Sequence, residues 1–219
     1  SLLLNGSDVT APTATGYNPA NGATNVALSG NLVITFSETI VKGTAGNIVV
    51  KRSSDNVTVQ TTAVTSASVT VSSNTATIAF SGLSYSTGYY INIDAGSFRD
   101  AAGNNYAGIS AANTWAFSTT AAPAAAVSVN PASLSFGFIA AGSSSVAQTV
   151  AFTTTNLSSS LTIAAPAAFD VSRDNISFAS SIVYTQAEAT AGQTFYVRFS
   201  PPSANTNYSG TLNFTGTGL

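Results

Sequence analysis

Short stretches in which apolar and polar residues alternate recur along the whole chain, and they constrain its fold more than any other feature. In the clearest of them, Tyr89, Ile91 and Ile93 alternate with Tyr90 and Asn92. A period of two places every second side chain on one face of a β-strand, so one face of this segment is expected to lie in a core. No stretch repeats with the 3.6-residue period of an amphipathic helix. The sequence therefore predicts an all-β fold with almost no helix.

The strand candidates form two groups, one on each side of the segment AAPAAA at residues 121–126. Each candidate is short, rich in β-branched residues and bounded by Ser, Asn or Gly, which is typical of an immunoglobulin-like (Ig-like) β-sandwich. We therefore expect two tandem sandwiches, at residues 8–120 and 127–219, joined by a linker at 121–126. The first group lies at residues 32–36, 48–51, 57–63, 69–71, 75–80, 89–93 and 115–120, and the second at 134–138, 146–154, 161–163, 169–171, 176–178, 182–184, 195–199 and 208–214.

A turn rich in Ser, Thr and Gly between Leu83 and Tyr89 marks a place where the chain changes sheet. Such a corner is expected wherever a sandwich passes the chain from one layer to the other. The strand that follows, at residues 89–93, runs directly into an acidic loop at residues 94–104. This stretch therefore carries both a sign of the fold and the best candidate for a ligand site.

Charged residues make up only 6% of the chain, against roughly 25% in a typical globular protein. The chain has six Lys and Arg residues and eight Asp and Glu residues, which gives a net charge of −2. No basic patch is available to neutralise phosphates, so we expect no nucleic-acid partner. A neutral surface of hydroxyls and amides favours association, so the expected partner is a further copy of the chain or the neighbouring domains of a longer chain. No apolar run approaches the roughly 18 residues of a membrane span.

The residue types present argue against catalysis. The chain has no His and no Cys, which removes the commonest general base and the thiol nucleophile. Its eight acidic residues are scattered over both domains instead of forming the carboxylate pair that a glycosidase needs. We therefore expect no enzymatic activity.

The segment SLLLNGS at residues 1–7 precedes the first domain and is uncharged and apolar. It is a linker or the end of a preceding strand in one interpretation. In the other, it is a strand given to the sheet edge of a neighbouring subunit, a mode in which backbone hydrogen bonds supply affinity and side-chain pockets supply specificity.

The first domain resembles the bacterial Ig-like modules that occur in tandem on surface adhesins. The resemblance is carried by DVTAP at residues 8–12, NPANGATNVALSGNLVITFSETI at 18–40, GYYINI at 88–93, DAAGN at 100–104 and WAFSTT at 115–120. It implies an Ig-like fold and an extracellular, cell-surface location.

The second domain resembles Ig-like modules of secreted multidomain proteins from Bacteroidetes-type bacteria. The residues that carry this resemblance are VSVNPASLSFGFIAAGS at 127–143, PAAFDVS at 166–172, FYVRFSPP at 195–202 and YSGTLNFTGTG at 208–218. Such modules accompany enzymes, adhesins and sorting signals alike, so the resemblance implies a context and no activity.

Calcium is the candidate cofactor, with Asp8, Asp100 and Asn104 as its ligands. Ca²⁺ takes six to eight oxygen ligands, and in an Ig-like sandwich the start of the chain and the loop before the last strand lie at one pole. In related adhesin modules such sites stiffen the joint to the preceding domain. The alternative is that Asp100 accepts hydrogen bonds from backbone amides of its own loop. We expect Glu38 to be a solvated charge or a partner of Lys42, not a ligand.

An aromatic site is a further alternative. Trp115 with Tyr85, Tyr89 and Tyr90 would form a sugar-stacking face, although a Trp on the last strand of such a domain is more often a core residue. The favoured function is a non-enzymatic structural or adhesive subunit, or a stalk segment, of a bacterial surface fibre or layer, assembled by strand addition. The alternative is a carbohydrate-binding or spacer module of a larger secreted enzyme.

Overall fold

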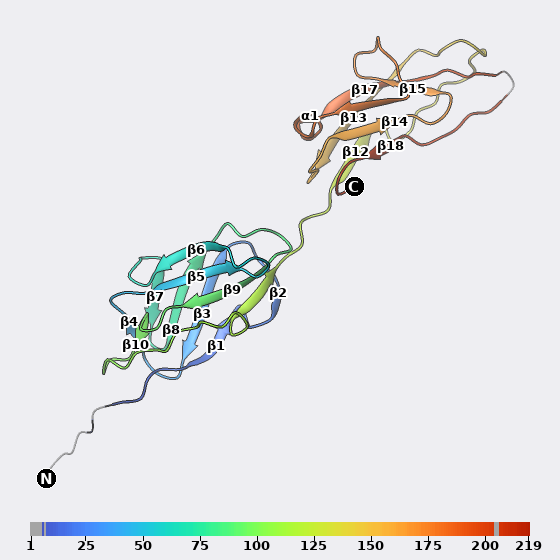
Figure 1. The fold of residues 1–219 in the computed structure, drawn as a ribbon. Coiled ribbons are helices and arrows are strands. Elements are labelled where there is room, and N and C mark those ends of the chain that lie inside the picture. Colours follow the sequence, from blue (N-terminus) through green and yellow to red (C-terminus); the bar gives the residue numbers. More distant parts are fainter. Residues whose placement is uncertain (1–5, 7, 204–205) are drawn as a thin grey trace. The chain divides into compact units, whose positions relative to one another are not determined.

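The structure, a computed structural model, describes residue 6, residues 8–203 and residues 206–219. It confirms the all-β prediction, because α1 (Gln186–Ala191) is the one α-helix in this part of the chain. The chain divides into two compact units, Ser1–Ala122 and Pro123–Leu219 (Figure 1). The apolar segment at residues 1–7, predicted to be a linker or a donated strand, lies outside the described residues apart from Gly6.

Unit 1 is a sandwich of two main sheets. One sheet has the strand order β1-β3-β8-β7, the other β2-β11-β9-β5-β6, and β10 pairs with β4 beside them. The β2–β11 pair is parallel and the other pairs are antiparallel. The strands are β1 (Ala14–Asn18), β2 (Ala23–Val26), β3 (Gly30–Phe36), β4 (Val41–Lys42), β5 (Asn47–Arg52), β6 (Thr58–Ala63), β7 (Val69–Ser72), β8 (Thr75–Phe80), β9 (Gly88–Ile93), β10 (Phe98–Arg99) and β11 (Ala116–Thr119).

The corner between β8 and β9 joins these two sheets, as the sequence predicts. Tyr89 begins the buried face of β9, and its hydroxyl oxygen accepts a hydrogen bond of 2.9 Å from the backbone N–H of Ser84. The bond fixes the turn against the strand that follows it. Tyr89, Ile91 and Ile93 are buried, as their alternation indicates, and Tyr90 on the opposite face is buried as well.

Unit 2 is also built from two sheets, of strand orders β12-β13-β17-β15 and β16-β14-β18. Phe195, Val197 and Phe199 of β17 are buried in its core. The next strand of that sheet, β15, places Asp170 opposite Arg198, and the two side chains form an ion pair at 3.0 Å. The strands are β12 (Ala126–Asn130), β13 (Gln148–Thr155), β14 (Leu161–Ala164), β15 (Phe169–Ser172), β16 (Ser181–Tyr184), β17 (Gln193–Phe199) and β18 (Asn213–Thr215).

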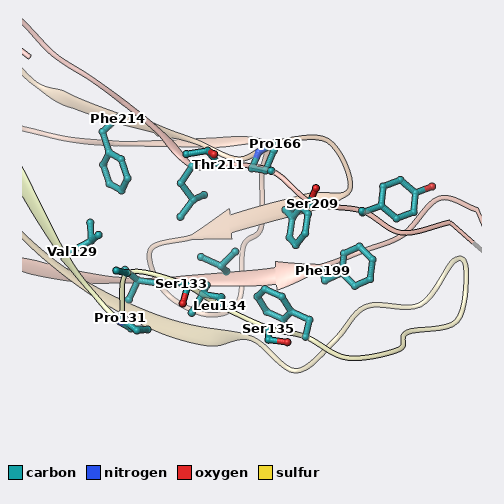
Figure 2. Close-up of a pocket in the computed structure, with 18 of the residues that line it drawn as sticks. Val129, Pro131, Ser133, Leu134, Ser135, Pro166, Phe199, Ser209, Thr211 and Phe214 are labelled. Atoms are coloured by element: carbon teal, nitrogen blue, oxygen red, sulfur yellow. The ribbon is translucent and has the colours of Figure 1, made fainter.

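Of the two segments predicted as strands at residues 134–138 and 208–214, only residues 213–214 form one, as the start of β18. Residues 134–138 follow β12, and residues 208–212 precede β18, but neither belongs to a sheet. Leu134 and Leu212 nevertheless pack against the core, and both segments border an apolar cavity (Figure 2). The strand prediction was wrong here because alternation indicates which face a segment buries, and not whether a partner strand lies beside it.

The strand predicted at residues 176–178 is also wrong, because Asp174 bends this segment into a loop. Its carboxylate oxygen accepts hydrogen bonds from the backbone N–H groups of Ile176 at 2.9 Å and Ser177 at 2.8 Å. Asn175, between Asp174 and Ile176, takes a positive φ of 60°, a conformation that Asn tolerates better than most residues. Ile176 is consequently 83% exposed and cannot contribute to a core.

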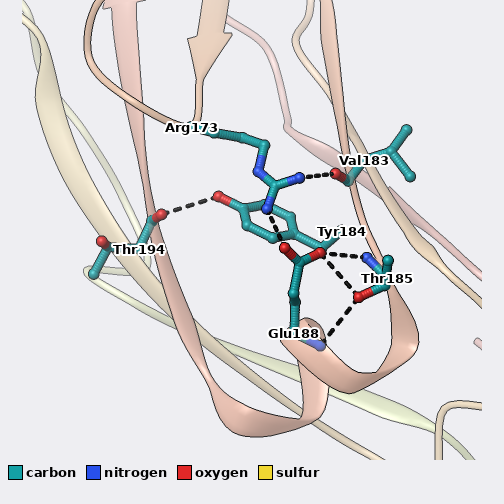
Figure 3. Close-up of polar contacts among 6 residues, drawn as sticks. All are labelled: Arg173, Val183, Tyr184, Thr185, Glu188 and Thr194. Atoms are coloured by element: carbon teal, nitrogen blue, oxygen red, sulfur yellow. Dashed lines mark hydrogen bonds and ion pairs between the residues drawn. The ribbon is translucent and has the colours of Figure 1, made fainter.

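The helix α1 is short and is held by its N-terminal residues (Figure 3). Thr185 and Glu188 form a capping box, in which the N–H of Thr185 donates to the carboxylate of Glu188 at 2.8 Å. The guanidinium of Arg173 pairs with that carboxylate, lies 4.2 Å from the centre of the Tyr184 ring and donates to the carbonyl of Val183. Each of these polar groups therefore has a partner within unit 2.

Candidate functional site

The candidate site is built on the leading segment of unit 1, residues 8–13, which is tied to the end of β3. The N–H of Ser37 donates to the carbonyl of Thr13 at 2.9 Å, and the N–H of Thr13 donates to the hydroxyl of Ser37 at 3.1 Å. Asp8 orders the start of the same segment, because its carboxylate accepts the N–H of Thr10 at 2.9 Å. These bonds bring Asp8 to the pole of unit 1 at which Glu38 follows β3.

The loop after β10 supplies the second half of the site. Asp100 is 3% exposed, and one of its carboxylate oxygens accepts the backbone N–H groups of Gly103 at 2.6 Å and Asn104 at 2.7 Å. Gly103 lies at a φ of +99°, which favours glycine in this tight turn. Burial opposes ionisation of Asp100, but the hydrogen bonds from Asn104 and the loop amides outweigh it and lower the pKa of this carboxyl. The prediction that Asp100 caps its own loop is therefore confirmed.

Three carboxylates converge at this pole. One oxygen from each of Asp8, Glu38 and Asp100 lies within 4.8 Å of the other two. Desolvation, together with the charges of Asp100 and Asp8, raises the pKa of Glu38. Three neighbouring oxygens that repel one another in this way are an arrangement that a hard cation would stabilise.

Glu38 differs from the other acidic residues because, within the described residues, no group donates a hydrogen bond to its carboxylate. Within the described residues it has no hydrogen bond and no ion pair. Its predicted partner Lys42 instead donates from Nζ to the carbonyl oxygen of Ser66 at 2.8 Å. The expected pairing of Glu38 with Lys42 is therefore wrong, and the carboxylate faces Asp8 and Asp100. The sequence signal for this arrangement is an acidic residue, Glu38, two positions after the buried strand β3 and at the same pole as the Asp100 loop.

Asn104 joins the two halves of the site. Its side-chain Nδ2 donates to Asp100 at 2.7 Å and to the backbone carbonyl oxygen of Asp8 at 3.1 Å. In this orientation the amide nitrogen, not the oxygen, faces the carboxylates. Asn104 therefore holds the leading segment against the loop, and its oxygen would reach a cation at this position only after the amide turns over.

The aromatic residues considered for sugar stacking are mostly inside unit 1. Trp115, Tyr89 and Tyr90 are buried, whereas Tyr85 is 43% exposed. The Trp115 ring stacks on Tyr17 with a centroid distance of 4.8 Å, and its indole N–H donates to the carbonyl of Pro19 at 2.8 Å. Trp115 is thus a core residue, and these four residues do not form an exposed platform.

No helix in the described part of the chain has the length and hydrophobicity that crossing a bilayer requires.

The comparisons with known proteins bear on unit 1. No curated protein matches the chain. The resemblance of residues 127–219 to modules of Bacteroidetes-type proteins stays a prediction, because the family match lies within the first unit. The profile described as "Bacterial Ig-like domain" matches residues 8–119, which is more than half of the 219 residues. The two packed sheets, the Tyr89 corner and this match together show that the chain belongs to the bacterial Ig-like domain family.

Proposed function

We propose that this chain is a non-catalytic structural segment of a bacterial cell-surface or secreted protein, and that a calcium ion fixes its leading segment to unit 1. The observation that carries the proposal is the convergence of Asp8, Glu38 and Asp100. These residues come from three separate parts of the chain. One ion between them would therefore cross-link the leading segment, the end of β3 and the loop after β10.

The chemistry of the cluster favours calcium over softer metals. The chain offers carboxylate, amide and carbonyl oxygens here, and it has no His or Cys of the kind that zinc prefers. Three carboxylates supply part of the six to eight oxygens that Ca²⁺ takes, and water supplies others. In the proposed complex the Asn104 amide turns over, so that its oxygen joins the carboxylates of Asp8, Glu38 and Asp100.

A structural role agrees with the rest of the molecule. The surface is poor in charge, with a net charge of −2 over 219 residues, and such surfaces favour association. A segment of a stalk, fibre or layer transmits force through the place where the chain enters each domain, and a cross-link there limits bending. Carbohydrate binding gains no support, because three of the four aromatic residues proposed for it are buried.

Hydrogen exchange of the full chain with and without calcium tests the proposal. Calcium should slow the exchange of the amides of Thr10 and Thr13, because the ion would hold the leading segment in place. The variant Asp8→Asn should lose this protection. The matched control Asp55→Asn, at an exposed position of unit 1, should keep it. Equal exchange with calcium and with a chelator would reject the calcium cross-link.

A further inference from the structure

Unit 2 has an apolar groove along one side of its core. The groove has a volume of about 600 Å³ and lies between two segments that we call the 131–137 bank and the 207–212 bank. Figure 2 shows Ser133 and Leu134 of one bank on the opposite side of the cavity from Thr211 of the other. Val150 and Val197 of the larger sheet contribute to its lining, and no charged residue lines it. The groove is therefore a largely apolar cavity between two segments that belong to no sheet.

Both banks have free backbone edges. Within the described residues, neither bank makes a backbone–backbone hydrogen bond or belongs to a sheet. The carbonyl oxygen of Ser135 accepts only the side chain of Gln148, at 2.7 Å. Both banks nevertheless carry the alternating residues of strands. The sequences of both banks are therefore suited to strands, but neither bank has a neighbouring strand to pair with.

The core beneath the groove is less completely covered than that of unit 1. Among the described residues, the core of unit 2 has eleven buried hydrophobic residues and nine that are only partly buried. The corresponding numbers for unit 1 are twenty and six. Leu134, Phe136, Leu212 and Phe214 are among the partly buried residues of unit 2, and all four line the groove. The uncovered apolar surface is thus concentrated where the strand is missing.

We propose that this groove accepts residues 1–7 of a second copy of the chain as an added β-strand, with Leu2, Leu3 and Leu4 at its centre. The inference deepens the proposed structural role by naming the contact through which copies join. A small apolar ligand would fill the volume but would leave the backbone groups of both banks to water. An added strand pairs those groups and fills the groove with side chains together.

The segment SLLLNGS fits the groove in length and in chemistry. Seven extended residues span about 24 Å, which is enough for a typical strand of five or six residues. The segment is uncharged, as is the lining of the groove. A donor from a second copy would join one chain to the next, as the proposed structural role requires, so we assign residues 1–7 in the groove to a second copy.

Disulfide trapping in the full chain tests this contact, because the chain has no cysteine of its own. Chains carrying Asn5→Cys are mixed with chains carrying Ser133→Cys or Thr211→Cys, one position on each bank. The matched control acceptor is Thr153→Cys, an exposed position on β13 outside the groove. We expect at least tenfold more mixed dimer with one of the bank positions than with Thr153→Cys. Equal yields, or no mixed dimer at either bank, would overturn the proposal.

Two further experiments test the role of the leucines and whether the donor belongs to a second copy. Replacing Leu2, Leu3 and Leu4 by Ser together should abolish trapping and reduce the concentration-dependent mass seen by sedimentation to that of a monomer. A chain carrying both Asn5→Cys and Thr211→Cys should cross-link between copies, and closure within one dilute chain would overturn the assignment to a second copy. Calcium protection of residues 8–13 should persist in the triple Ser variant. Loss of trapping therefore tests the groove, and loss of calcium protection tests the proposed function separately.

Discussion

Most of the eight carboxylates of this chain accept hydrogen bonds that order the backbone near them. Six accept a backbone N–H group and thereby order a turn, a loop or the start of the helix, and the ion pair with Arg198 accounts for Asp170. Glu38 is the remaining one, and its pKa is raised by desolvation and by Asp100 and Asp8. The six that accept a backbone N–H are Asp8, Asp55, Asp94, Asp100, Asp174 and Glu188.

The substitution Glu38→Gln should change the stability of the metal-free protein and of the calcium complex in opposite directions. A carboxyl whose folded pKa is raised favours folding while it is protonated, and this stability is lost as the pH rises through the folded pKa. With a chelator present, thermal melts should therefore show the wild type losing stability relative to Glu38→Gln as the pH rises above about 4. With calcium at neutral pH the order should reverse, because the variant lacks a ligand. The same order under both conditions would show that Glu38 does not bind the ion.

Asp174 should contribute to the acid stability of unit 2. Hydrogen bonds from the backbone N–H groups of Ser177 and Ile176, and from the Ser172 hydroxyl, lower its pKa from 3.8 to about 2. A lowered folded pKa adds stability that is present above the unfolded pKa and is lost as the pH falls through the folded one. Urea unfolding midpoints of unit 2 should therefore fall between pH 4 and pH 2, and this fall should be shallower in Asp174→Asn. Parallel curves for the two proteins would contradict the role of Asp174.

At the scale of elements, alternation located strands such as β3, β8 and β9 because each lies between two neighbours with one face in the core. The same pattern failed at residues 134–138 and 208–212, which have no strand beside them. Pairing depends on residues distant in sequence, so a local period cannot report it. The meeting of Asp8 with Asp100 was predictable from the common poles of a sandwich, whereas the orientation of Glu38 depends on how the chain turns after β3.

The corner at the start of β9 offers a test of one such element. Removing the hydroxyl in Tyr89→Phe leaves the Ser84 N–H without its partner, and it should lower the free energy of unfolding of unit 1 by about 1–2 kcal/mol. Tyr85→Phe is the matched control, because this residue is 43% exposed, and it should change stability by less than about 0.5 kcal/mol. Urea denaturation followed by tryptophan fluorescence reports on unit 1, since Trp115 is the one tryptophan of the chain. Equal effects of the two substitutions would contradict the role of the corner.

At the scale of the whole molecule, two hydrophobic cores with no residue in common support two units. Each core is built around aromatic residues, with Trp115 and Phe36 in unit 1 and Phe152 and Phe195 in unit 2. In the proposed surface protein, packing holds each unit together, calcium fixes the leading segment to unit 1, and an added strand joins one copy to the next. The low charge of the sequence indicated association, but it could not indicate the groove through which we propose that association occurs.

Separate chains of residues 8–122 and 123–219 should each fold. Because the two hydrophobic cores share no residue, each fragment should melt cooperatively within a few degrees of the corresponding transition of the full chain. Differential scanning calorimetry of the three proteins measures this. A fragment that shows no cooperative transition would mean that its unit depends on the other for stability.

Calorimetric titration of calcium into the full chain tests the proposed calcium cross-link most directly. We expect one ion to bind per chain at neutral pH, with binding lost in Asp8→Asn and in Glu38→Gln and retained in Asp55→Asn. The absence of binding heat in the wild type, together with an unchanged melting temperature on adding calcium, would contradict it. So would equal binding by all four proteins, since the ion would then lie elsewhere.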